Sequence, residues 1–213
     1  LGMTGRILVG KNNTLLDTSF YSSNPSINKH NHLYFFFKKY VMIYNDTRRF
    51  GFIKFYTEKE FLKSSHFIHL GVEPLSASLN FRYFKEKIKG FKKSIKNTLM
   101  DQSFICGLGN IYVNEVLFIS KISPRRLSFK IKDNEIILLI KSIKRILKKS
   151  IVFGGSTIKD FHNSEGKSGK FQNFFKVYGK EGQGCPRNSC KGTIQRSVIS
   201  SRATFFCTKC QVE

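Results

Sequence analysis

Four cysteines near the C-terminal end constrain the fold of this sequence more than any other feature. Cys185 and Cys190 are separated by four residues, Cys207 and Cys210 by two, and sixteen residues lie between the pairs. Close thiolate pairs at this spacing are typical of a tetrahedral Zn²⁺ site, because each pair fits on one tight turn. The sequence therefore predicts one structural Zn²⁺ bound by all four thiolates, at the base of a β-hairpin.

A pair of disulfides is the alternative for these cysteines. No segment has the pattern of a signal peptide, and the chain is rich in lysine, so zinc is the favoured prediction. The fifth cysteine, Cys106, lies among apolar residues and is predicted to be a packed thiol rather than a ligand. Reduced thiols and zinc together indicate a cytoplasmic protein.

The charge of the chain points to a polyanionic partner. Lysine and arginine number 37 against 14 acidic residues, which gives a formal net charge of +23. Nucleic acid is the first candidate for such a partner. A gene rich in A and T is an alternative explanation for the charge, because the abundant residues Lys, Ile, Phe and Asn all have codons rich in A and T. No apolar run approaches the ~20 residues of a membrane span.

Hydrophobic patterning predicts an α+β chain. Turn residues separate short runs of aromatic and branched residues at the start, helices follow, and two strands lie between the cysteine pairs. The predicted strands are Arg6–Gly10, His32–Lys38, Val41–Tyr44, Gly51–Tyr56, Thr193–Val198 and Ala203–Phe206. The predicted helices are Phe81–Lys89, Ser94–Gln102, Ile111–Ser120 and Asp133–Val152.

The loop Asp46–Gly51 has residue types that suit contact with DNA bases. It places Arg48 and Arg49 beside Phe50 at a strand junction. A guanidinium can form two hydrogen bonds to a base edge, and a phenyl ring can insert between stacked bases. The alternative is a surface arginine pair beside a core phenylalanine.

A double-glycine turn, Gly107-Leu108-Gly109, precedes the predicted helix Ile111–Ser120. Glycines allow close approach of the backbone to a phosphate, and a helix N-terminus attracts negative charge. Asn110 is predicted to be an N-cap or a phosphate donor. A plain corner between two helices is the alternative.

Three segments together resemble bacterial formamidopyrimidine-DNA glycosylases. These segments are Asp46–Gly51, Lys96–Phe118 and Tyr178–Gln211, and the resemblance extends over essentially the whole sequence. Two departures are visible. The family usually has two residues between the first two cysteines instead of four, and proline where Thr47 stands.

The resemblance implies a role for each candidate residue. Arg48 pairs with the base opposite the lesion, Phe50 wedges beside it, and Met3 fills the space left by the damaged base. Lys96 and Asn110 bind phosphates, and Lys92 is a weaker candidate on the condition that its helix begins early enough. Arg202 donates a proton in the second elimination. The implied DNA-binding residues are Met3, His30, Arg48, Phe50, Lys92, Lys96, Asn110 and Arg202; the metal ligands are Cys185, Cys190, Cys207 and Cys210.

The implied fold is α+β, with a partial N-terminal β-sandwich, a helical helix–two-turn–helix domain and a C-terminal zinc-finger β-hairpin. The predicted domains are residues 1–70 for the partial β-sandwich and 75–163 for the helical domain. Residues 164–177 form a loop that covers the lesion, and 178–212 form the zinc finger.

The implied function is base-excision repair of damaged double-stranded DNA. The enzyme is a bifunctional glycosylase and AP lyase that removes oxidised purines (8-oxoguanine and formamidopyrimidines) and nicks the strand by β,δ-elimination. We expect a monomer without a membrane segment, in a bacterial cytoplasm and associated with the nucleoid. Two alternatives remain open: a non-catalytic zinc-dependent DNA-binding remnant, and a zinc-ribbon protein of transcription or translation.

The N-terminal end of the sequence does not match the family's catalytic start. The family's nucleophile is an N-terminal proline followed by a glutamate, whereas this sequence begins Leu1-Gly2-Met3-Thr4-Gly5. The proline, the glutamate and an assisting lysine would all lie upstream of the matching region. We therefore expect the sequence to be N-terminally incomplete, and its 213 residues to bind damaged DNA without cutting it.

Overall fold

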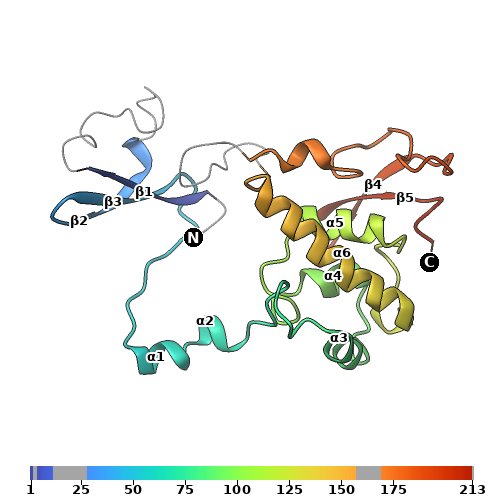
Figure 1. The fold of residues 1–213 in the computed structure, drawn as a ribbon, viewed down its shortest axis with the longest axis horizontal. Coiled ribbons are helices and arrows are strands. Elements are labelled where there is room, and N and C mark those ends of the chain that lie inside the picture. Colours follow the sequence, from blue (N-terminus) through green and yellow to red (C-terminus); the bar gives the residue numbers. More distant parts are fainter. Residues whose placement is uncertain (2–3, 12–27, 157–168, 213) are drawn as a thin grey trace. The chain divides into compact units, whose positions relative to one another are not determined.

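The structure is a computed structural model that describes residues 1, 4–11, 28–156 and 169–212. The chain divides into two compact units (Figure 1). Unit 1 comprises Leu1–Tyr56 and Val152–Asn173, and unit 2 comprises Thr57–Ile151 and Phe174–Glu213. The predicted α+β class is confirmed, with the described strands at the two ends of the chain and most of the helices between them.

Unit 1 contains a three-stranded antiparallel sheet in the order β1-β3-β2 (Figure 1). The strands are β1 (Gly5–Lys11), β2 (Asn31–Phe36) and β3 (Tyr40–Asp46), and a short 3₁₀ turn, Asn28–His30, precedes β2. Leu8 on β1 packs with Val41 and Ile43 on β3. These residues share one face because side chains alternate along a strand, and they form the local core of the sheet.

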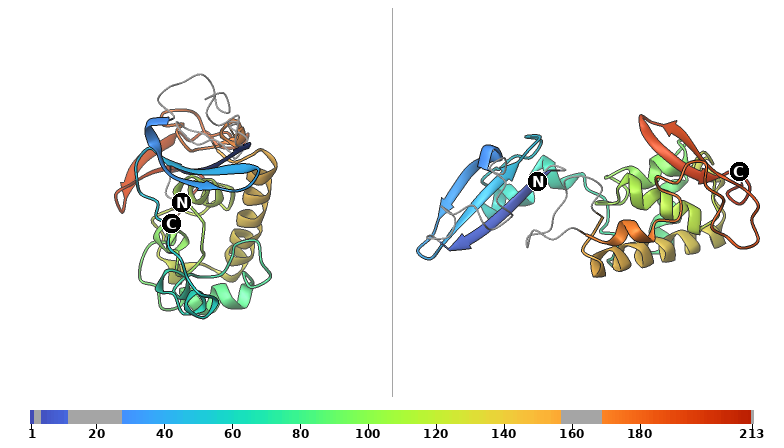
Figure 2. Two further views of the ribbon diagram at one scale, coloured as in Figure 1. Left: turned by 90° about the vertical axis from the view of Figure 1, so that its left-hand side faces the viewer. Right: turned by 90° about the horizontal axis from the view of Figure 1, so that it is seen from above.

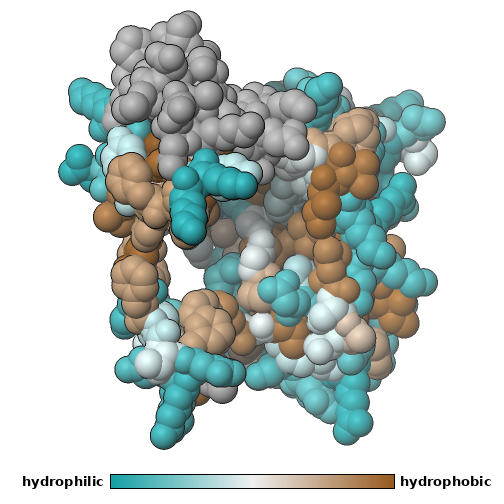
Figure 3. All heavy atoms as spheres, turned by 60° about the vertical axis from the view of Figure 1, so that its left-hand side comes forward, coloured by the Kyte–Doolittle hydropathy of each residue, from teal (hydrophilic) through white to brown (hydrophobic). Residues whose placement is uncertain are grey.

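The predicted strand Gly51–Tyr56 is wrong. The segment has no strand assignment and pairs with no described strand. β3, which ends just before the Asp46–Gly51 loop, already has β1 on one side and β2 on the other, so it has no free edge for this segment. Its two phenylalanines, Phe52 and Phe55, are exposed instead. Figure 3 shows hydrophobic side chains of this kind at the surface among hydrophilic ones.

Two short helices follow that the sequence analysis did not predict, α1 (Glu58–Leu62) and α2 (Ser65–Ile68). Thr57 and Glu60 form a capping box at the start of α1: the Thr57 side chain accepts from the Glu60 N–H, and the Glu60 carboxylate accepts from the Thr57 N–H. Because the capping box is readable as Thr-x-x-Glu, the signal for α1 was present in the sequence.

Four longer elements build the helical part of unit 2: α3 (Phe81–Ile88), α4 (Ile95–Met100), α5 (Asn110–Ile119) and α6 (Asp133–Val152). A 3₁₀ turn, Ser128–Lys130, precedes α6, and another, Phe171–Phe174, precedes the finger. Residues at three- and four-residue spacing on α6 are buried, as its periodicity predicts; they include Ile136, Leu139, Ile143 and Ile146. Within the described part of the chain, no helix has both the length and the apolar character to cross a membrane.

The C-terminal hairpin consists of β4 (Ile194–Ile199) and β5 (Arg202–Cys207), paired antiparallel. Figure 2 shows it lying against the helices of unit 2. Phe118 of α5 is buried in one cluster with Val177, Ile194, Phe205 and Cys207. The predicted hairpin is therefore confirmed, and its core is continuous with helix α5.

Candidate functional site

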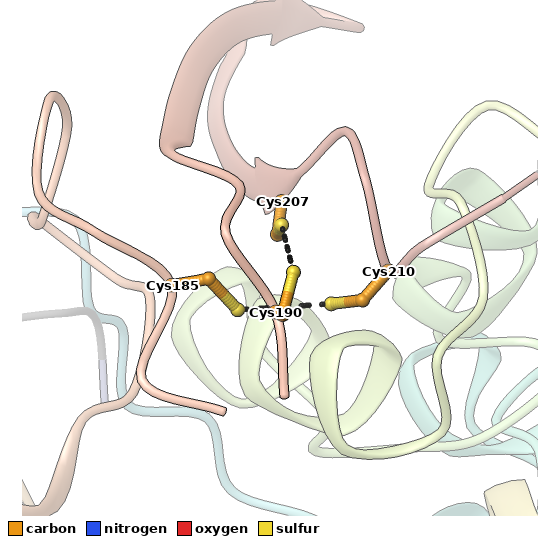
Figure 4. Close-up of side chains that lie close together, drawn as sticks. All are labelled: Cys185, Cys190, Cys207 and Cys210. Carbon is orange, nitrogen blue, oxygen red and sulfur yellow. Dashed lines mark hydrogen bonds between the residues drawn. The ribbon is translucent and has the colours of Figure 1, made fainter. Parts of the chain in front are cut away.

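The four C-terminal cysteines meet at the base of the hairpin, as predicted (Figure 4). Their sulfur atoms all lie within 4.8 Å of one another. The Cys185 and Cys210 sulfurs are 3.8 Å apart, and those of Cys190 and Cys207 are 3.6 Å apart. A tetrahedron with Zn–S bonds of about 2.3 Å has sulfur–sulfur separations of about 3.8 Å. The cluster therefore has the ligand type and the spacing that suit Zn²⁺.

The backbone around the first cysteine pair closes a loop despite its four-residue spacing. The Cys185 N–H donates to the Gly192 carbonyl at 2.8 Å, and the Cys190 N–H donates to the Arg187 carbonyl at 2.9 Å. A Cβ at position 192 would lie 2.7 Å from Cys207 Sγ and 2.8 Å from Lys209 Cβ. Glycine is therefore needed at 192 for the loop to approach the second cysteine pair.

The ionisation of the thiols depends on their surroundings. Burial, together with hydrogen bonds that the Cys210 thiol donates to the sulfurs of Cys207 and Cys185, raises the pKa of Cys210 to about 12. Burial also acts to raise the pKa of Cys207, but the N–H groups of Cys210 and Lys209 outweigh it and lower that pKa. Four thiols this close cannot all ionise without a cation, and a divalent metal ion would supply the compensating charge.

Three polar side chains of α5 hold the C-terminal segment by its backbone. Asn110 Nδ2 donates to the Ala203 carbonyl at 3.0 Å, and Asn114 Oδ1 accepts from the Phe205 N–H at 2.6 Å. The buried Glu115 carboxylate accepts from three consecutive N–H groups at 2.8–3.0 Å, those of residues 176–178. Neither Asn114 nor Glu115 was predicted to have this role. Their signal was two polar residues within an otherwise apolar helix.

Asn110 is not the N-cap of α5. The helix begins at Asn110 itself, and Gly109 occupies the N-cap position without a side-chain cap. The amide of Asn110 is instead part of the contact with β5.

Lys96 is fully buried on α4 beneath the hairpin. Its Nζ donates to Thr204 Oγ1 at 2.6 Å and lies 3.4 Å and 3.5 Å from the carbonyl oxygens of Arg202 and Ala203. Burial, with a smaller contribution from the charge of Arg202, lowers the pKa of Lys96 to about 8. The side chains of Lys96 and Asn110 thus converge on one short segment of β5.

Arg202 lies at the start of β5, next to the tip of the hairpin, and is exposed. Ser200 and Ser201 form the two-residue loop between β4 and β5, with φ of 48° and 58°. Two-residue hairpin loops require such positive φ values, which glycine or asparagine adopts most easily. The serines therefore place Arg202 at the end of the hairpin through backbone conformations that are unfavourable for them.

In unit 1, the carboxylate of Asp46 organises the Asp46–Gly51 loop. It accepts from Thr4 Oγ1 at 2.6 Å, the Tyr44 hydroxyl at 2.9 Å, the Gly51 N–H at 2.9 Å and the Arg48 N–H at 3.2 Å. Burial acts to raise the pKa of Asp46, but these hydrogen bonds outweigh it and hold the pKa well below its ordinary value. The hydrogen bonds of the Asp46 carboxylate thus fix the conformation of this loop, which has Thr47 where the family usually has proline.

Arg48 and Phe50 lie together on this loop. The Arg48 Cζ lies 4.5 Å from the centroid of the Phe50 ring, and both residues are exposed. Arg49 between them has φ of 56°. His30 is half-buried at the end of the 3₁₀ turn before β2.

Two further predictions concern Lys92 and Met3. Lys92 is exposed and lies before α4, which begins at Ile95 with Ser94 as its N-cap. Lys92 therefore does not share a helix face with Lys96. Its prediction as a DNA contact required the helix to begin early enough to include it, and the helix does not. Met3 and residues 157–168, which include part of the predicted lesion-covering loop, lie outside the described residues. Cys106 is buried and donates to Glu73 Oε1 at 3.3 Å, away from the cysteine cluster.

Comparison with known proteins identifies the family. A sequence profile of the formamidopyrimidine-DNA glycosylase H2TH domain matches residues 70–162. A formamidopyrimidine-DNA glycosylase from Rickettsia felis is 42% identical over 212 residues, which cover 99% of this chain and 72% of the relative. The chain belongs to the formamidopyrimidine-DNA glycosylase family. The protein of the same name from Rickettsia canadensis is 41% identical, with the same coverage.

Solved structures of formamidopyrimidine-DNA glycosylases agree with this family. A complex of the Lactococcus lactis enzyme with DNA containing an abasic site has a TM-score of 0.83 at 35% identity. A structure of MutM with DNA containing carbocyclic 8-oxo-G has the same TM-score and identity. Each comparison covers all of this chain and 73% of the solved chain. By family, the protein is thus a DNA glycosylase of base-excision repair.

Proposed function

We propose that the protein acts on damaged double-stranded DNA as a bifunctional glycosylase and AP lyase for oxidised purines, namely 8-oxoguanine and formamidopyrimidines. Membership of the glycosylase family supports the class of enzyme. The match of residues 70–162 to the H2TH domain argues against a zinc-ribbon protein of transcription or translation. The β,δ-elimination, with Arg202 as proton donor for its second step, follows by resemblance to the family.

The main support for the proposal is that the side chains of Lys96 and Asn110 both contact the β5 strand of the hairpin. Both side chains donate to the Ala203 carbonyl, Lys96 Nζ at 3.5 Å and Asn110 Nδ2 at 3.0 Å. The next residue towards the tip is the exposed Arg202. The exposed guanidinium of Arg202 thus lies on a segment that the buried Lys96 ammonium and the Asn110 amide hold by its backbone, and groups of these three types bind phosphate. We assign a DNA phosphate to this place.

The Asp46–Gly51 loop would read the base opposite the lesion. Arg48 has the planar donor set that pairs with a base edge, and Phe50 is an exposed ring that can wedge between bases. Met3 and His30 complete the proposed DNA contacts by resemblance to the family, whereas Lys92, which lies before α4, is not proposed as a contact. The assignment of residues 1–70, 75–163, 164–177 and 178–212 as domains is part of the same proposal.

Zinc would be structural in this protein. Cys185, Cys190, Cys207 and Cys210 fit Zn²⁺ because their sulfurs have the mutual spacing of a tetrahedral site. When bound, the ion stabilises the fold through its four thiolates and leaves no open ligand position for catalysis. The remaining proposals are a monomer in a bacterial cytoplasm, associated with the nucleoid.

Binding measurements test this function without requiring cleavage. Fluorescence anisotropy should give a lower Kd for a duplex with an abasic-site analogue opposite cytosine than for the undamaged duplex. Arg48→Ala should reduce the preference for cytosine opposite the lesion. Arg49→Ala, which removes the same charge from the neighbouring residue, should retain it. Equal Kd values for damaged and undamaged duplexes would contradict the proposal.

A further inference from the structure

The loop between the first two cysteines is bonded to helix α5 through one side chain, that of Arg187. Its Nη2 donates to the carbonyl oxygens of Phe118 at 2.6 Å and Ile119 at 3.1 Å. Its Cζ lies 4.6 Å from the centroid of the Phe118 ring. These two residues end α5, where the helix dipole favours a positive charge; the Phe118 carbonyl also accepts from the Lys121 N–H at 3.0 Å.

The other end of the same helix carries Asn110, which bonds to the Ala203 carbonyl. α5 has ten residues, so its two ends are about 14 Å apart. Helix α5 is thus one rigid element. Its last turn contacts the cysteine loop, and its first turn carries a residue of the proposed phosphate site. Between them, Asn114 bonds to the Phe205 N–H, which keeps the helix in register with β5.

We propose that Arg187 is a positioning residue for DNA binding: it fixes the cysteine loop to the end of α5 and thereby fixes Asn110 against the hairpin. This inference rests on the proposed function of Asn110. Nη2 is occupied by two carbonyl groups, the guanidinium lies over the Phe118 ring, and Nε is buried without a hydrogen-bond partner among the described residues, so we place Arg187 against the helix and not on a phosphate. Lysine would keep the charge but lacks the planar group that stacks on Phe118.

The first test compares Arg187→Ala with Lys191→Ala, which removes one positive charge from an exposed residue just after the same loop. Zinc release to a chromogenic chelator and the Kd for a duplex with an abasic-site analogue are measured on each protein. Arg187→Ala should release zinc faster and bind DNA about tenfold more weakly, since it loses hydrogen bonds from a charged group. Lys191→Ala should leave zinc release unchanged. Arg187→Lys should be intermediate, and it serves as the test if the alanine variant does not fold.

A double-mutant cycle separates positioning from a general loss of stability. If Arg187 acts through α5, Arg187→Ala should weaken DNA binding much less in an Asn110→Ala background than in the unmodified protein. The full effect in both backgrounds, or no effect in either, would overturn the inference. If Asn110→Ala itself binds DNA as tightly as the unmodified protein, the proposed phosphate role of Asn110 fails, and the inference fails with it.

Discussion

The buried Lys96 should make DNA binding depend on pH in a range where ordinary lysines do not titrate. Burial, followed by the charge of Arg202, lowers the pKa of Lys96 from 10.5 to about 8. A phosphate bound beside this group would favour its charged form and raise the pKa again. Because the bound state then holds the proton more tightly than the free state, DNA binding above pH 8 must be accompanied by proton uptake.

The size of the effect follows from the two pKa values. With a pKa of about 8, Lys96 is mostly protonated at pH 7 and mostly neutral at pH 9. If a phosphate returns the pKa to its ordinary value, the Kd should rise about tenfold between pH 7 and pH 9. Anisotropy titrations with an abasic-analogue duplex, at constant salt, measure this change directly.

Two variants decide whether Lys96 is the cause. Lys96→Met has no proton to exchange, so it should bind more weakly at pH 7 and show little further change at pH 9. Lys92→Met is the matched control, because it removes an exposed lysine nearby and should keep the pH dependence. A Lys96→Met protein with the same pH dependence as the unmodified protein would refute this reasoning.

Three further predictions concern the hairpin and its base. Ser201→Gly keeps the positive φ but removes the Cβ that makes it unfavourable by roughly 1–2 kcal/mol, so it should raise the Tm by a few degrees, measured by circular dichroism. Ser201→Ala keeps the Cβ and should give no such increase. Arg202→Ala should make the negative slope of log Kobs against log salt shallower by about one. An unchanged slope would exclude a phosphate contact. Gly192→Ala should weaken zinc binding, seen as fewer zinc ions per chain, because its Cβ would meet Cys207 Sγ. Gly184→Ala, which meets nothing within 4 Å, should bind zinc normally.

Features set by local spacing could be predicted from the sequence. The cysteine cluster and the hairpin follow from two close pairs separated by a strand–turn–strand pattern. α6 follows from its apolar periodicity, and α1 was predictable from the Thr57 and Glu60 capping box. These signals depend on residues a few positions apart, so they can be read without knowledge of the tertiary structure.

Features set by distant partners could not be predicted. The segment Gly51–Tyr56 has the composition of a strand, but a strand also needs a partner, and both edges of the preceding strand β3 are taken by β1 and β2. A lysine is ordinarily a surface residue, and the burial of Lys96 is explained by its contacts with β5, which include Thr204, 108 residues away. Glu115 is likewise buried because three backbone N–H groups of a distant segment surround its carboxylate.

We infer that the cysteine cluster at the base of the hairpin and the helices of unit 2 act as one DNA-binding structure. The most direct test is to follow zinc content and DNA affinity together while a chelator removes the metal from reduced protein. We expect one zinc ion per chain at the start, and a loss of DNA binding in proportion to the zinc released. No zinc in the reduced protein, or full DNA affinity after its removal, would contradict the claim.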